Sequence, residues 1–193
     1  MDGILYLLMG VALSLAVVWA RTRYADFLAQ SPNDYASGED VFDLRQHLNG
    51  ALVCEGVIYG PTGRVSSRFV GDFDISWEGN KGVMREEFHY DDGSTQNRAW
   101  HLNIGNDGRI RATADDVVGE GVGHQSGPTV QLKYRIRLPE DSGGHVLDTV
   151  DWMYLAPNGT IVNRSQFRKY GLKVAELVAT MRQAEPAELK DAA

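Results

Sequence analysis

The strongest constraint on the fold comes from residues 64–78, where apolar and polar side chains alternate. One set of alternate positions is mostly apolar: Val65, Ser67, Phe69, Gly71, Phe73, Ile75 and Trp77. The other set is mostly polar: Arg64, Ser66, Arg68, Val70, Asp72, Asp74, Ser76 and Glu78. Because successive side chains of a strand point to opposite faces, this pattern predicts one long strand with an apolar and a solvated face. Such a strand would span ~45 Å if straight, which favours a sheet that bends around a barrel.

Turn residues divide the rest of the chain at the spacing of an antiparallel meander. The predicted strands cover residues 49–59, 64–78, 83–91, 94–104, 109–118, 130–138, 145–155, 160–164 and 172–182. Four glycines interrupt the pattern over residues 119–128. Residues 172–182 also fit a helix, but a barrel needs a partner for its first edge, so we prefer a strand. The pattern predicts an all-β, antiparallel up-and-down barrel of 8–10 strands, with a two-sheet β-sandwich as the alternative.

An uncharged apolar run covers residues 4–20 and would span ~25 Å as a helix, enough to just cross a bilayer. A cleaved signal peptide and a buried helix are the alternatives, but a signal peptide needs a basic region that is missing here. Arg21 and Arg23 follow the run and favour a cytoplasmic location for the rest of the chain. We expect an uncleaved, single-pass anchor in the bacterial inner membrane.

These features divide the chain into four parts. Residues 1–23 are the transmembrane or signal-anchor segment, and residues 24–41 are a linker rich in Ser, Asp and Ala. Residues 42–183 form the barrel domain, and residues 184–193 are a polar tail. A short helix is expected over residues 41–48, with Asp40 as its N-cap.

Composition excludes several function classes. The net charge of −7 and the absence of a basic stripe argue against a nucleic-acid partner. One cysteine, Cys54, excludes an internal disulfide and a cysteine-built zinc site. No nucleophile stands beside an evident base, and the five histidines lack metal-ligand spacing. We therefore assign no catalytic residue, metal or cofactor, and the oligomeric state stays open.

Short motifs spread over residues 42–182 resemble a known family. They are Arg68-Phe69, Trp77-Glu78-Gly79, Glu86-Glu87-Phe88, Asp92-Gly93, Arg98-Ala99-Trp100, the run from Asp115 to Gly119, Asp151-Trp152-Met153-Tyr154, Asn163-Arg164 and Lys169-Tyr170-Gly171. Together they resemble the bacterial domain-of-unknown-function family 3833. The resemblance implies a lipocalin-like envelope protein in the periplasm, with a lipid ligand because its genes often lie near those for fatty-acid modification. Many relatives look like lipoproteins, whereas this chain has no cysteine just after its apolar run.

Three polar residues, Glu86, Arg98 and Asp116, fall on strand faces that are otherwise apolar. If the turn places Phe88 opposite Arg98, then Arg98 lies diagonally across from Glu86. A buried carboxylate and guanidinium need partners. Two interpretations stay open: a structural ion pair, or an arginine that grips a ligand carboxylate at the bottom of a cavity.

Two further sets of residues are candidates. The aromatic residues Trp77, Trp100, Tyr134 and Trp152 are either the lining of a lipid cavity or ordinary core. The pair Asp115 and Asp116, with Glu120 and His124, would make an acid–base or metal site only if a bulge turned both aspartates to one face.

These observations predict a membrane-anchored, lipocalin-like barrel that binds a lipid or fatty-acid-like ligand, as an accessory to membrane lipid modification. Two alternatives differ in class. The first is an enzyme acting on a modified lipid, with Glu86, Arg98 and Asp116 as its polar cluster. The second is a ligand-free envelope interaction module with a filled barrel.

Overall fold

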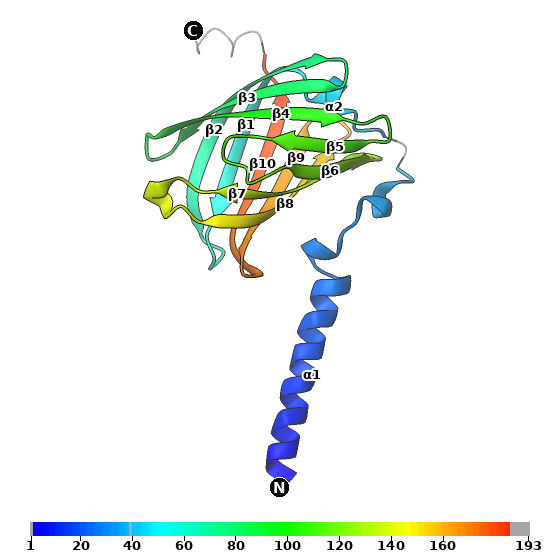
Figure 1. Ribbon diagram of the computed structural model, residues 1–193, viewed down its shortest axis with the longest axis vertical. Helices are drawn as coiled ribbons and strands as arrows, with labels where there is room; N and C mark the ends of the chain where they lie inside the picture. Colours follow the sequence, from blue (N-terminus) through cyan, green and yellow to red (C-terminus); the bar gives the residue numbers. More distant parts are fainter. Residues whose placement is uncertain (1, 39, 186–193) are drawn as a thin grey trace.

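The computed structural model describes residues 2–38 and 40–185, and Figure 1 shows a β-barrel with one long helix projecting from it. Within these residues, ten antiparallel strands close into a barrel in the order β1-β10-β9-β8-β7-β6-β5-β4-β3-β2. The strands are β1 (Gly50–Tyr59), β2 (Val65–Glu78), β3 (Lys81–Tyr90), β4 (Thr95–Ile104), β5 (Arg109–Thr113), β6 (Gly121–Ser126), β7 (Thr129–Arg137), β8 (Val146–Leu155), β9 (Ile161–Lys169) and β10 (Leu172–Gln183). The predicted up-and-down barrel is confirmed, and the alternative β-sandwich is wrong.

The last strand closes the barrel. β10 pairs with β1 from Leu52↔Gln183 to Tyr59↔Glu176, so the first strand has no free edge. The expectation that residues 172–182 form a strand is therefore confirmed. Residues 186–193, most of the expected polar tail, lie outside the described residues.

Five helical segments accompany the barrel in the described ranges. They are α1 (Asp2–Tyr24), η1 (Phe27–Ala29), η2 (Pro32–Tyr35), α2 (Leu44–His47) and η3 (Glu140–Ser142). Helix α1 has no buried residue and is long and apolar enough to cross a membrane, a property that a signal sequence shares. The predicted cap of the short helix is wrong: α2 begins at Leu44, and Asp43 rather than Asp40 accepts a hydrogen bond from the Arg45 amide at 3.0 Å.

No strand was predicted over the glycine-rich residues 119–128, where the glycines interrupt the alternation, but this stretch contains strand β6. Gly123 pairs with Leu132 of β7, and a Cβ at this position would clash with the carbonyl oxygen of Gln131. Glycine therefore permits a close approach of the two backbones. The preceding strand was predicted too long, because β5 ends at Thr113 and the chain then turns through residues 114–120.

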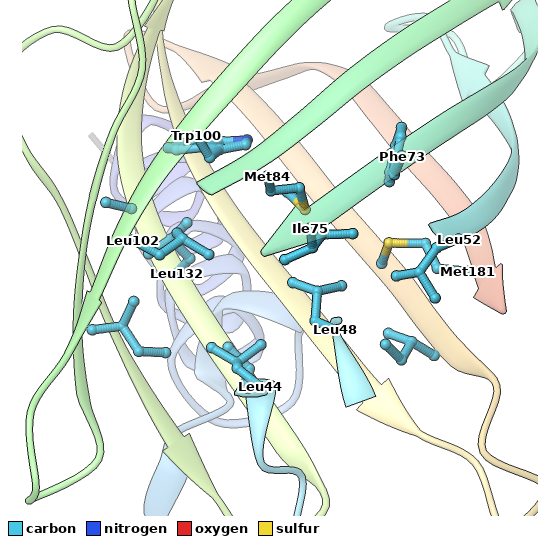
Figure 2. Close-up of a cluster of buried hydrophobic side chains, with 14 of the residues drawn as sticks. Leu44, Leu48, Leu52, Phe73, Ile75, Met84, Trp100, Leu102, Leu132 and Met181 are labelled. Carbon is cyan, nitrogen blue, oxygen red and sulfur yellow. The ribbon is translucent and has the colours of Figure 1, made fainter. Parts of the chain in front are cut away.

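One end of the barrel is closed. Figure 2 shows Leu44 and Leu48, from α2 and its C-cap, inside the barrel, with Leu48 beside Ile75. Both leucines are at most 2% exposed, and the carbonyl of Leu48 accepts a 2.8 Å hydrogen bond from Trp77 Nε1. We call this the closed end. The open end is bounded by the turns at residues 60–64, 91–94, 114–120, 138–145 and 170–171.

Candidate ligand-binding cavity

The barrel encloses a cavity of about 1060 Å³ that reaches the open end. Its deep wall is apolar and includes Leu44, Leu48, Met84, Leu102, Ile110 and Val130. Near the open end the wall becomes polar, with Ser66, Ser67, Asp92, Ser94, Gln96 and Glu140. This distribution follows from the strands, whose inward faces are apolar, and from the turns, whose residues are hydrophilic.

A charged cluster lies on the wall at mid-depth, where Glu86 of β3 and Arg98 of β4 are directly opposite. The guanidinium Nε of Arg98 donates to Asp116, at 3.0 Å from Oδ1 and 2.8 Å from Oδ2. Arg98 Nη1 is 3.8 Å from Glu86 Oε2, which is too long for a hydrogen bond. The direct partner of Arg98 is therefore Asp116, which reaches back from the turn after β5.

The strand register differs from the one assumed in the sequence analysis. Phe88 pairs with Gln96, not with Arg98, so Glu86 faces Arg98 directly and not diagonally. The two-residue difference arises because the turn between β3 and β4 is centred on Asp92, one residue earlier than the assumed pairing requires. A shift of two residues keeps every side chain on its face, so the alternation could not reveal it.

Two buried polar atoms of this cluster have no hydrogen-bond partner in the described chain, Glu86 Oε2 and Arg98 Nη2. Both residues line the cavity. The guanidinium carbon of Arg98 lies 4.2 Å from the centroid of the Trp100 ring, which itself contacts Tyr134 edge-to-face at 5.1 Å. The aromatic rings hold the guanidinium in place, while an acceptor and a donor stay available to a ligand.

A second polar group, missed in the sequence analysis, lies on the opposite wall. Asp151 of β8 accepts hydrogen bonds from Ser165 Oγ at 2.9 Å and from the Asn163 side-chain amide, both on β9. All three residues line the cavity. The sequence does contain a signal for Asp151: it occupies the same set of alternate positions as Leu147 and Met153, which face inward on β8.

Burial sets the protonation of these groups. It raises the pKa of Glu86 to about 7, against the opposing influence of Arg98. Burial also raises the pKa of Asp151, although the hydrogen bonds from Asn163 and Ser165 oppose it. For Arg98, burial alone would lower the pKa, but the acidic groups of Tyr134, Glu86 and Asp116 outweigh burial and raise it. The permanent cation of Arg98 thus shares the cavity with two carboxyl groups, those of Glu86 and Asp151, whose pKa is raised by burial.

The predicted site residues separate into two groups. Glu86, Arg98, Trp100, Asp116 and Tyr134 all line the cavity. The other two aromatic residues do not.

Trp77 points inward but lies at the closed end, where its ring covers Gly82. The assignment of Trp152 to the cavity is wrong. It lies on the outer wall of the barrel, fully buried, with its ring 5.5 Å from that of Tyr35 in the linker.

The second candidate set does not assemble. Asp115 is exposed at the mouth of the cavity, and Glu120 pairs with Arg111 at 3.6 Å. Within residues 2–38 and 40–185, no group of three or more His, Cys, Asp or Glu side chains is placed to hold a metal ion.

The model of a family of proteins of unknown function, DUF3833, matches residues 23–183. The chain belongs to this family. The match confirms the resemblance drawn from the short motifs and covers the linker as well as the barrel of this DUF3833 protein. No curated protein matches it in sequence.

Solved structures show the same fold. The S-type phycobiliprotein lyase CPES from Guillardia theta has a TM-score of 0.53 and 9% sequence identity over 72% of the DUF3833 chain and 90% of its own. Rv2717c from M. tuberculosis has a TM-score of 0.52 and 13% identity over 72% and 94% of the two chains. At these identities the likeness concerns the fold, which is a lipocalin-like barrel.

Proposed function

We propose that this protein is a membrane-anchored carrier or accessory protein that binds a lipid or fatty-acid-like amphiphile inside its barrel. The cavity is the observation that supports the proposal: about 1060 Å³ of mainly apolar space with unpaired polar atoms on Glu86 and Arg98. Small-molecule sites commonly measure roughly 300–1,000 Å³ and combine apolar walls with a few placed polar groups. One protein with a similar fold is named as a lyase, so a barrel of this shape is compatible with an enzyme as well as with a carrier.

The charges around Arg98 restrict the polar group of the ligand. The carboxyl groups of Glu86, Asp116 and Asp151 act on one another across the cavity, so a further carboxylate would meet repulsion. A neutral group that accepts a hydrogen bond from Arg98 Nη2 and donates one to Glu86 Oε2 satisfies both unpaired atoms. We therefore expect a monoacylglycerol or a long-chain alcohol to bind at least as tightly as the matching fatty acid. Fatty-acid affinity should fall as the pH rises through about 7, where Glu86 ionises.

The first test blocks the cavity. Ala175 lines it, whereas Val178 lies on the outer face of the same strand and is 37% exposed. In calorimetric titrations of the full chain with a monoacylglycerol, we expect Ala175→Trp to lose binding and the control Val178→Trp to retain it. Equal affinity in both folded variants, or no lipid retained in native mass spectrometry of the wild type, would reject the proposal.

The second test concerns the polar group. The double variant Arg98→Met with Asp116→Asn removes the guanidinium and also neutralises Asp116, so the direct partner of Arg98 is not left as an unpaired carboxylate. If Arg98 binds the ligand, the folded double variant should lose about 1.5–3 kcal/mol of affinity, the range for a hydrogen bond to a charged group. Unchanged affinity would mean that the ion pair of Arg98 is purely structural.

The anchor is tested separately. We expect the protein to remain in the membrane fraction with residues 4–20 retained, because no basic region precedes the apolar run. A mature N-terminus at Arg21 would contradict this.

A further inference from the structure

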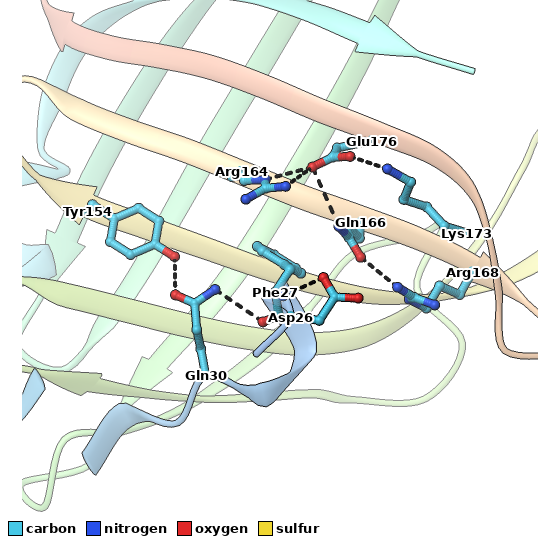
Figure 3. Close-up of polar contacts among 9 residues, drawn as sticks. All are labelled: Asp26, Phe27, Gln30, Tyr154, Arg164, Gln166, Arg168, Lys173 and Glu176. Atoms are coloured by element: carbon cyan, nitrogen blue, oxygen red, sulfur yellow. Dashed lines mark hydrogen bonds and ion pairs between the residues drawn. The ribbon is translucent and has the colours of Figure 1, made fainter. Parts of the chain in front are cut away.

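The segment after α1 is attached to the outer wall of the barrel (Figure 3). Phe27 is 5% exposed, with its ring centroid 4.8 Å from the guanidinium carbon of Arg164 on β9. Gln30 Oε1 accepts a 2.8 Å hydrogen bond from the hydroxyl of Tyr154 on β8. Arg164 is itself held by an ion pair with Glu176 of β10. The linker therefore contacts the barrel and does not separate it from the helix.

This attachment keeps the barrel close to the end of α1. Only Ala25 and Asp26 separate Tyr24, the last residue of α1, from Phe27. Three Cα–Cα steps span at most ~11 Å. The outer wall at Arg164 must therefore stay near the C-terminal end of the helix.

The C-terminal end of α1 carries the residues that favour a membrane–water boundary. The rings of Trp19 and Tyr24 lie edge-to-face at 6.1 Å, and the Arg23 guanidinium stacks over Tyr24 at 5.2 Å. Arg21 adds a second cation in the last turn. Aromatic rings and cations of this kind concentrate at lipid headgroups, which places the boundary at residues 19–24.

Two hairpin tips project from the open end on the side of α1. Figure 1 shows the β1–β2 and β9–β10 turns at the lower side of the barrel, from which the helix also projects. We define the rim as Arg64, Val65, Lys169, Tyr170 and Leu172 of these two hairpins. Its apolar members are highly exposed: Tyr170 91%, Leu172 72% and Val65 52%.

The geometry of β9 brings the rim to the level of the boundary. From Arg164 to Tyr170 the chain advances six residues, about 20 Å along a strand. Figure 1 shows the β9–β10 tip at the level of the C-terminal end of α1, which brings it close to the plane that residues 19–24 define.

We propose that the rim rests on the lipid bilayer that α1 spans, with Tyr170 and Leu172 between the headgroups and Arg64 and Lys169 beside anionic ones. Exposed apolar side chains flanked by cations bind such a surface. The cavity wall reaches Ser66 and Ala175, close in sequence to the rim, so this contact places the cavity mouth beside the lipids. The inference uses the membrane anchor of the proposed function but needs no ligand in the cavity.

The test uses the full chain in vesicles of phosphatidylcholine and phosphatidylglycerol that contain a lipid with a nitroxide on its acyl chain. A polarity-sensitive fluorophore is attached to a cysteine introduced by Leu172→Cys. Controls carry it through Asn158→Cys, in the β8–β9 turn at the closed end, or Leu13→Cys, in α1. The native Cys54 is buried and stays unlabelled.

We expect the nitroxide to quench the Leu172 label several times more strongly than the Asn158 label, and the Leu13 label most strongly. Adding Arg64→Gln and Lys169→Gln should reduce quenching at Leu172 to the level seen in vesicles of phosphatidylcholine alone. Weak quenching at both Leu172 and Asn158, with strong quenching at Leu13, would reject the proposed contact of the rim with the bilayer but would still support α1 as a membrane anchor. Weak quenching at all three positions would overturn the anchor and the rim together.

Discussion

The proton on Glu86 should contribute measurably to stability. The residue is 7% exposed, and burial raises its pKa to about 7 from an ordinary value of 4.5. The folded state therefore binds this proton more tightly than the unfolded chain does. The resulting stability is complete below about pH 4.5 and is lost as the pH rises through about 7. At about 1.4 kcal/mol per pH unit, ionisation of Glu86 costs the fold about 3 kcal/mol.

The variant Glu86→Gln keeps the shape of the side chain and removes its ionisation. We expect it to exceed the wild type in free energy of unfolding by up to about 3 kcal/mol above pH 8. The difference should shrink to nearly zero below about pH 4, where the wild-type carboxyl is mostly protonated in both the folded and the unfolded state. Arg98 keeps its hydrogen bonds to Asp116 in the variant, so no buried cation is left unpaired. Urea denaturation across this pH range measures the difference directly.

The neighbouring Glu87 provides the matched control. It lies on the opposite face of β3, with a side chain that is 54% exposed. Glu87→Gln should change the free energy of unfolding by no more than about 0.5 kcal/mol at any pH. If Glu86→Gln proved less stable than the wild type above pH 8, Glu86 would have to be an ionised partner of Arg98, and the reasoning would be wrong.

Asp116→Asn should lower the free energy of unfolding by about 3 kcal/mol in urea, because Arg98 loses its bound carboxylate; a much smaller effect would mean that Arg98 finds another partner. Gly123→Ala should cost about 2 kcal/mol, because the added methyl group meets the Gln131 carbonyl, and an unchanged melting temperature would contradict the close pairing of β6 and β7. Burial raises the pKa of the Cys54 thiol, so an aromatic disulfide reagent should modify it only after unfolding. Immediate reaction in the native protein would place this thiol outside the core.

Local patterns in the sequence were enough to predict the architecture. The alternation in β2 and the turn residues between strands identified most of the barrel, because successive side chains of a strand point to opposite faces of the sheet. The same rule placed Glu86, Arg98 and Trp100 on the inward face. The need to pair the first edge decided between strand and helix for β10.

Contacts between segments that are distant in the sequence could not be predicted from the alternation of side chains along each strand. Asp116 binds Arg98 because the turn after β5 brings it back to the cavity. The direct pairing of Arg98 with Glu86 was not predicted, because shifting the strand register by two residues leaves every side chain on the same face. Trp152 was misplaced because the outer face of β8 is also apolar, covered by Tyr35 of the linker. Only the tertiary structure decides which apolar face encloses the cavity, since burial depends on what packs against a strand and not on the strand itself.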